Sequence, residues 1–173
     1  LSDEQMDALS LAASIHDIGK ISIPAEILNR AGRLSDIEFA LVKTHSQNGY
    51  DILKDIDLPW NIAEVVLQHH ERIDGSGYPE GLKGHQIHLG ARIIAVADVI
   101  DAMTTHRPYR AGLGLQKAEE EVERGRGTLY DEDVAINGVM PGRDVLGTEI
   151  NGQRILREVV VHEGMLSWVV FQP

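Results

Sequence analysis

Histidine and aspartate side chains occur inside several otherwise apolar stretches of this sequence. His16 and Asp17 lie in the segment SIHDIGK, while His45, the pair His69–His70 and Asp98 lie in three further stretches. Burying ionisable groups costs free energy unless they pair with a partner or bind a metal. Neutral imidazoles and carboxylates are ready ligands for divalent metal ions. A shared metal cluster would account for all of these placements at once.

Each residue taken alone also has a structural interpretation. A pair such as His16–Asp17 is often only a hydrogen-bonded feature, and one member of His69–His70 could face solvent. The combination favours a metal site, because three helical segments direct a histidine inward and a fourth contributes Asp98. With no cysteine in the chain, this ligand set suits iron or manganese, with zinc as the alternative. More than three candidate ligands indicate at least two ions, which Asp17 could bridge.

Three basic residues near these ligands could bind phosphate. Two close metal ions can stabilise the oxygens of an in-line phosphoryl displacement. Lys20 lies one helical turn beyond His16, where it could stabilise developing negative charge. Arg107 and Arg110 in RPYR follow the Asp98 stretch, and each could bind phosphate oxygens through two N–H groups. The alternatives are a surface lysine near a helix C-terminus and two surface arginines.

The first ligands are predicted to lie at the end of a helix. Ser2 and Gln5 fit a capping box, and the apolar stripe of the helix that follows runs on to His16. Gly19 is the predicted stop of this helix. A short helix is predicted to begin at Pro24 and to end near residue 32.

Further helices are predicted to carry the remaining ligands. Ser35 and Glu38 fit a second capping box. The residues expected on one face of this helix are Ile37, Leu41, His45 and Ile52. Those expected to face inward on the next helix, which follows Pro59, are Ile62, Val65, Val66 and His69. Asp98 and Asp101 are three residues apart on a predicted helix over 89–103 and so share a face.

Between and after these helices, two segments are predicted to lie outside the ligand set. The stretch GSGYPEGLKG (75–84) is rich in glycine and proline and is predicted to be a loop. His85 and His88, which follow it, are expected to be surface loop residues. Residues 115–124 form a strongly charged predicted helix, solvated on one side.

The C-terminal part of the chain has a different character. After about residue 133 helical periodicity fades, and ILREVVV and MLSWVVF predict two strands joined by His162, Glu163 and Gly164. We therefore predict a domain over residues 1–133 and an atypical tail over 134–173. This tail carries no motif that indicates chemistry.

Length and composition limit the function classes. The 173 residues suit one domain with a small appendage, and the net charge of −11 disfavours a surface for nucleic-acid polymers. The absence of cysteine fits a reducing, cytoplasmic location. No signal peptide or membrane-spanning segment is predicted. Because the chain begins with leucine, it is expected to be a piece of a longer protein.

Four motifs in this order and spacing resemble the HD-GYP family, a branch of the HD metal-dependent phosphohydrolase superfamily. They are HDIGK at 16–20, KTHSQNGYDIL at 43–53, HHERIDGSGYPEGLKG at 69–84 and ARIIAVADVIDAMTTHRPYR at 91–110. The resemblance covers residues 2 to 134. It implies an all-α fold, the HD-domain helical bundle, with the predicted strands as a small β-hairpin in the tail. It also implies hydrolysis of a cyclic dinucleotide, above all cyclic di-GMP.

The resemblance assigns roles to individual residues. It implies a centre of two or three divalent metal ions, whose ligands here are His16, Asp17, His45, His69, His70 and Asp98. It places Asp17 and Lys20 in catalysis, and Lys20, Arg107 and Arg110 in substrate binding. Gly77, Tyr78 and Pro79 form the loop motif, which in the family surrounds the site and contacts diguanylate cyclase (GGDEF) domains. Its alternative role is a rigid turn.

The resemblance also implies an additional helix, an additional domain and a partner subunit beyond this chain. Members usually carry a helix before the HD pair that supplies a further histidine, and this chain begins after that helix. Members commonly follow a receiver or sensory domain, so an upstream domain is expected, and a homodimer is a further expectation.

The sequence therefore predicts three candidate functions. The first is a metal-dependent phosphodiesterase that opens cyclic di-GMP to pGpG or continues to GMP in bacterial second-messenger signalling. The second is a catalytically degenerate module that binds nucleotide or a GGDEF-domain partner. The third is an HD phosphohydrolase of linear nucleotides, which the GYP motif argues against.

Overall fold

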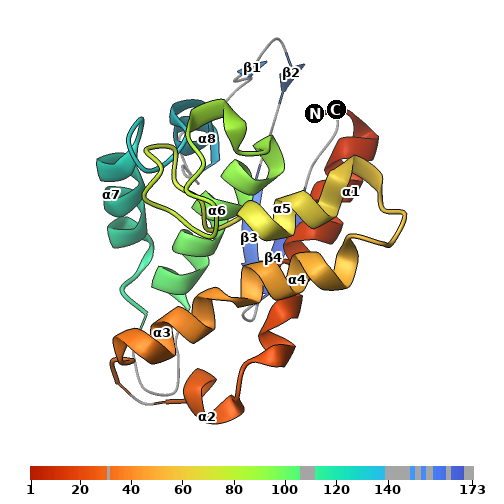
Figure 1. The fold of residues 1–173 in the computed structure, drawn as a ribbon. Coiled ribbons are helices and arrows are strands. Elements are labelled where there is room, and N and C mark those ends of the chain that lie inside the picture. The colour runs from red at the N-terminus through yellow and green to blue at the C-terminus, as the bar shows by residue number, and fades with distance from the viewer. Residues whose placement is uncertain are drawn as a thin grey trace.

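The computed structural model describes residues 1–30, 32–105 and 112–138, together with four short strands between 149 and 169. Helices dominate this part of the chain (Figure 1), so the predicted helical fold class is confirmed. The α-helices are α1 (Asp3–Ile15), α2 (Ala25–Leu28), α3 (Asp36–Lys43), α4 (His45–Leu53), α5 (Ile62–Gln68), α6 (Leu89–Thr104), α7 (Leu115–Gly125) and α8 (Glu132–Gly138). The 3₁₀ turns are η1 (Ile18–Ser22), η2 (Pro59–Asn61) and η3 (Gly84–Gln86).

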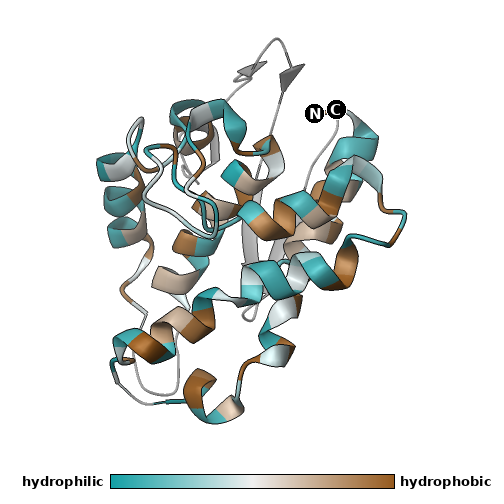
Figure 2. Ribbon diagram, viewed as in Figure 1, coloured by the Kyte–Doolittle hydropathy of each residue, from teal (hydrophilic) through white to brown (hydrophobic). Residues whose placement is uncertain are grey.

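The hydrophobic core is centred on α5, which packs against α1, α4 and α6. Ile62, Val65 and Val66, which the sequence predicts to face inward, are fully buried. Each such side chain contributes about 1.5–3 kcal/mol when it leaves water. Helix α7 packs against α6 and is mostly hydrophilic in Figure 2, with Ala118 and Val122 buried on its inner side. The helices that carry the predicted ligands therefore rest on one common core.

Both predicted capping boxes are present. The Ser2 hydroxyl accepts a hydrogen bond from the Gln5 N–H, and the Gln5 side chain accepts one from the Ser2 N–H. Ser35 and Glu38 make the same reciprocal pair at the start of α3. These caps satisfy backbone donors that have no partner within the helix.

The predicted stop at Gly19 is wrong. Helix α1 ends at Ile15, and Gly19 lies inside η1, which packs directly on α4. A Cβ atom on Gly19 would lie 1.9 Å from the carbonyl oxygen of His45. A side chain does not fit at this distance, so glycine is required for close approach of two segments rather than for ending a helix. The short helix α2 likewise ends earlier than predicted, at Leu28.

The predicted common face of Ile37, Leu41, His45 and Ile52 is also wrong. The predicted single helix is divided at Thr44 into α3 and α4. Ile37 is 83% exposed, whereas His45 is 1% exposed. Helix α3 buries none of its residues, whereas α4 buries His45, so the apolar residues on the two sides of Thr44 do not share an inward face.

In the tail, the structure describes two pairs of antiparallel strands. The predicted hairpin corresponds to β3 (Glu158–His162) and β4 (Met165–Val169), in which His162 pairs with Met165. The connection therefore begins one residue later than predicted. A shorter pair, β1 (Glu149–Ile150) with β2 (Gln153–Arg154), was not predicted. Helix α8 runs across Val134, and the domain boundary there stays a prediction.

None of the helices in the described part of the chain combines the length and hydropathy needed to span a bilayer.

Candidate metal centre

Three of the predicted histidines lie where a helix ends. His16 directly follows α1, His69 directly follows α5, and His45 comes two residues after the end of α3. The last carbonyl groups of a helix have no partner within it. A side chain at this position can therefore reach a free carbonyl one turn back.

Each of these imidazoles uses that carbonyl to fix its orientation. The bonds, from Nδ1 to a backbone oxygen three residues earlier, are His16 to Ala13 at 2.6 Å, His45 to Val42 at 2.7 Å and His69 to Val66 at 2.6 Å. A carbonyl only accepts hydrogen bonds, so Nδ1 must carry the proton and donate. In the neutral ring this leaves Nε2 with a free lone pair. A backbone partner of this kind is typical of metal-binding histidines.

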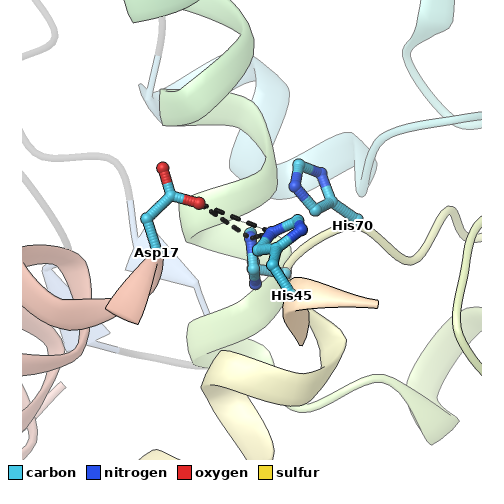
Figure 3. Close-up of side chains that lie close together, drawn as sticks. Asp17, His45 and His70 are labelled. Atoms are coloured by element: carbon cyan, nitrogen blue, oxygen red, sulfur yellow. Dashed lines mark hydrogen bonds and ion pairs between the residues drawn. The ribbon is translucent and has the colours of Figure 1, made fainter. Parts of the chain in front are cut away.

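The free ring nitrogens meet the Asp17 carboxylate in one place. Ligand atoms of Asp17, His45, His69 and His70 all lie within 4.8 Å of one another. Figure 3 shows Asp17 and His45 pointing toward each other, with His70 beside them. Side chains from three separate segments are thus brought together, as the sequence predicted for these four residues.

Within this cluster, acceptor atoms face acceptor atoms. His45 Nε2 lies 3.3 Å from His69 Nε2 and 3.4 Å from Asp17 Oδ1. Asp17 Oδ1 is buried and has no hydrogen-bond partner. Lone pairs that converge without a donor between them repel one another, and a buried acceptor without a partner is costly. A divalent cation would satisfy all of these atoms, so the residues present fit a metal ion.

Burial keeps three of the imidazoles neutral. It lowers the pKa of His45, lowers the pKa of His69 to about 3, and lowers the pKa of His70 further still. The nearby imidazoles add to the effect on His69 and His70. These rings are therefore uncharged at neutral pH, and their close contacts with Asp17 are not ion pairs. Uncharged imidazole is the form that binds metals.

Asp17 stays ionised because two basic groups flank it. Burial alone would raise the pKa of Asp17, but His16 and Lys20 hold it well below its usual range. His16 Nε2 lies 3.4 Å from Asp17 Oδ2, and Lys20 Nζ lies 2.5 Å from the same oxygen. Burial would lower the pKa of His16, yet the hydrogen bond and charge of Asp17 outweigh it and raise that pKa.

Asp98 and His16 border the four-residue cluster. Asp98 Oδ2 lies 4.0 Å from His70 Nδ1. Burial raises the pKa of the Asp98 carboxyl, and the Asp17 charge adds to that rise. The structure therefore brings four of the six predicted ligands within mutual reach and places the other two at the edge. Arg107 and Arg110 lie outside the described residues.

The loop motif covers one side of the centre. The Tyr78 ring stacks on the His70 ring, with centroids 4.8 Å apart and an interplanar angle of 29°. A Cβ atom on Gly77 would lie 2.4 Å from the Glu71 Cα, so only glycine allows the loop to pass this closely. The Tyr78–Pro79 peptide bond is cis. The motif therefore contacts a candidate ligand directly.

The structure reveals a loop-anchoring residue beside the centre that was not predicted from the sequence. Glu71 is 2% exposed, and its carboxylate accepts hydrogen bonds from the backbone N–H groups of Glu80, Gly81 and Leu82 at 2.7, 3.1 and 3.0 Å. These bonds fix the loop immediately after Tyr78 and Pro79. The signal was an acidic residue directly after the two histidines and before a glycine-rich loop, whose free N–H groups need an acceptor.

His88 also differs from its prediction as a surface loop residue. It is half-buried, its ring packs edge-on against Trp60, and its Nδ1 accepts the Gly90 N–H at 3.1 Å to cap α6. His85 is exposed, as predicted.

Known proteins are similar to this chain in sequence. A cyclic di-GMP phosphodiesterase response regulator, RpfG of Xanthomonas campestris, is 40% identical over 155 residues, which are 88% of this chain and 40% of that protein. A cyclic di-GMP phosphodiesterase of Pseudomonas aeruginosa is 48% identical over 119 residues, which are 68% of this chain and 29% of that protein. Relatives from Vibrio cholerae at 33–42% identity are named 3′3′-cGAMP-specific phosphodiesterases. The chain spans less than half the length of each of these proteins.

A solved structure supports the fold assignment. The crystal structure of a cyclic GMP-AMP-specific phosphodiesterase of V. cholerae matches with a TM-score of 0.57 and 20% identity, over 79% of this chain and 38% of that chain. The family model described as HD domain matches residues 1–134. This chain therefore belongs to the HD domain family, in agreement with the resemblance of its motifs to the HD-GYP branch.

Proposed function

We propose that this chain is the catalytic part of a metal-dependent phosphodiesterase that hydrolyses cyclic di-GMP. The observation that carries the proposal is the convergence of Asp17 Oδ1 with the free ring nitrogens of His45 and His69, with no donor among them. The relatives named as cyclic di-GMP phosphodiesterases support the substrate class.

Asp17, His45, His69 and His70 would hold a divalent metal ion, and His16 and Asp98 would be ligands for a second ion. A bound divalent ion supplies activated water and stabilises the negative charge of phosphoryl transfer. The nitrogen and oxygen ligand set favours iron or manganese, with zinc as the alternative.

The chain's own residues would bind and orient the substrate. Lys20 lies beside Asp17, where its ammonium group can pair with a phosphate oxygen and stabilise the charge that develops there. Arg107 and Arg110 are proposed to bind substrate phosphate oxygens through bidentate contacts. The carbonyls of Ala13, Val42 and Val66 would keep three imidazoles in place during turnover.

The test is hydrolysis of cyclic di-GMP by protein loaded with Fe²⁺, Mn²⁺ or Zn²⁺, with pGpG and GMP separated by chromatography. Removing a residue that only hydrogen-bonds to a metal ligand typically lowers activity about 10–100-fold. Asp17→Ala removes a ligand itself, so it should lower turnover by at least about 100-fold. Asp51→Ala, which changes an exposed carboxyl on α4, is the control and should match the wild type. Equal turnover of Asp17→Ala and wild type would contradict the proposal.

The same experiment distinguishes the alternatives. Faster hydrolysis of 3′3′-cGAMP than of cyclic di-GMP would assign the specificity that the V. cholerae relatives are named for. Binding of cyclic di-GMP without turnover under any metal would favour a degenerate module. Hydrolysis of linear nucleotides alone would indicate another HD phosphohydrolase.

The partners of the whole protein also stay proposals. The relative named a response regulator supports an upstream receiver domain. A GGDEF-domain partner, a homodimer and a cytoplasmic location remain predictions from the sequence.

A further inference from the structure

An exposed aromatic ring and a lysine lie beside the candidate metal centre. Phe39 is 50% exposed on α3, and Lys43 follows one turn later on the same helix. Lys43 Nζ lies 5.3 Å from the centroid of the Phe39 ring and 5.7 Å from that of the Tyr78 ring. Since Tyr78 stacks on His70, a continuous row of side chains leads from the cluster to α3.

The charge of Lys43 is not balanced by a carboxylate within the described residues. Two other lysines near it in sequence have such partners, because Lys20 pairs with Asp17 and Lys54 with Asp51. The chain as a whole carries a net charge of −11. A cation without an acidic partner beside the candidate centre is free to attract the phosphate of an anionic substrate.

The two aromatic residues of this row, Tyr78 and Phe39, differ in how much of the ring is covered by the protein. Tyr78 is held against His70 by a loop that Glu71 anchors with three hydrogen bonds. Phe39 leaves half of its surface in water, although burial of an aromatic ring is favourable. An aromatic face of this kind can stack a nucleobase, because every base has a π-face, and a nearby lysine binds the attached phosphate.

We propose that Phe39, Lys43 and Tyr78 form a subsite for one purine base of the cyclic dinucleotide and the phosphate next to it. The subsite rests on the proposed function, since it positions the second half of the substrate while the first phosphate lies at the metal centre. Phe39 stacks the base, Lys43 binds the phosphate, and Tyr78 forms the wall between this subsite and His70.

Two readouts test the subsite. The first is the ratio of kcat/KM for cyclic di-GMP to kcat/KM for bis(p-nitrophenyl) phosphate, a diester without a nucleobase. The second is the equilibrium Kd for cyclic di-GMP. Phe39→Ala and Lys43→Met should each lower the ratio and raise the Kd about tenfold, the effect of losing one base stack or one phosphate contact. Matched controls are Ile37→Ala on α3 and Lys117→Met on α7, both exposed.

The outcomes separate this proposal from the proposed function. If the wild type hydrolyses no cyclic dinucleotide but binds cyclic di-GMP, a tenfold weaker Kd in both variants still supports the subsite. If the ratio and the Kd of Phe39→Ala equal those of Ile37→Ala, the subsite is overturned while the metal centre stands. Failure of the wild type to bind cyclic di-GMP at all also overturns it.

Discussion

Glu71 shows at the scale of one residue how a buried carboxylate can organise a loop. A charged acceptor forms stronger hydrogen bonds than a neutral one, and this carboxylate accepts hydrogen bonds from three backbone N–H groups of the loop. The position of the Tyr78 ring against His70 depends on this anchor. We therefore expect Glu71 to act as a positioning residue for the candidate centre, through the loop that it anchors.

Replacing Glu71 by glutamine should destabilise the fold by about 2–3 kcal/mol, because one amide oxygen replaces two carboxylate oxygens and the NH₂ group faces other donors. Urea unfolding measures the change, and amide hydrogen exchange at residues 80–82 should become faster. Glu80→Gln alters an exposed carboxyl of the same loop and serves as the control. Equal stability of the two variants would show that the three hydrogen bonds contribute little.

Between elements, the distance from η1 to α4 fixes the distance from Asp17 to His45. Gly19 lies against the His45 carbonyl, and a Cβ atom on Gly49 would lie 2.8 Å from the Val66 side chain. Gly19 and Gly49 thus allow η1, α4 and α5 to pack closely against one another. All four clustered ligands lie at or directly beside the ends of these three segments.

Gly19→Ala should separate η1 from α4, because the new methyl group cannot occupy a position 1.9 Å from a backbone oxygen. The expected cost is about 3 kcal/mol or more in the free energy of unfolding, at the upper end for overpacking, together with weaker metal binding. Gly84→Ala is the control for metal binding, since no atom lies within 4 Å of its added Cβ; its positive φ costs some stability but should leave metal affinity unchanged. A variant that keeps wild-type metal affinity would contradict this account of Gly19.

The cap of α6 should make that helix sensitive to acid. Burial, and to a lesser extent the charge of Arg92, lowers the pKa of His88 below its ordinary value of 6.5. The unfolded chain therefore takes up the proton first as pH falls, and the stability that the neutral ring contributes is full above pH 6.5 and lost below it. Protonation also removes the acceptor at Nδ1 that binds the Gly90 N–H.

His88→Asn keeps a capping side chain that does not titrate, so it separates this effect from the other histidines. The free energy of unfolding of the wild type should fall relative to that of His88→Asn by about 1 kcal/mol between pH 7.5 and 5, the usual contribution of an N-cap. Urea unfolding at both pH values measures the difference. A constant difference across this range would show that His88 does not act as a pH-sensitive cap.

For the whole molecule, metal binding should contribute to folding. The clustered acceptors destabilise one another without a cation, and a ligand that binds only the folded chain stabilises it. At a free Mn²⁺ concentration of 100 times Kd the gain is about 2.7 kcal/mol, and a chelator should reverse it. Thermal unfolding measures the shift. Asp17→Asn should show little shift and Asp51→Asn the full shift, whereas equal shifts would place the ion elsewhere.

The sequence predicted correctly those features that depend on the spacing of residues within one helix or on the residue type alone. The capping boxes at Ser2 and Ser35 and the inward face of α5 depend on spacing within one helix. The clustering of Asp17 with the histidines followed from ionisable groups in apolar surroundings and from the family motifs.

Predictions from the sequence were wrong or missing where the position of a residue depends on packing between segments that are far apart in the chain. Gly19 was assigned to a helix end because its contact with His45 depends on how η1 lies on α4. Ile37 is exposed although its spacing suited burial, because the whole of α3 lies at the surface. Glu71 was missed because its partners, nine to eleven residues away, become available only when the loop folds back.

The attachment of three imidazoles to the ends of helices has a kinetic consequence. Swinging His16, His45 or His69 out of the centre requires breaking its bond to a carbonyl in the last helical turn. Escape of an ion would then be governed by fraying of those turns rather than by free rotation of side chains. Dissociation should accordingly speed up with temperature as steeply as local unfolding does, and the ion would be retained for long periods in the cold.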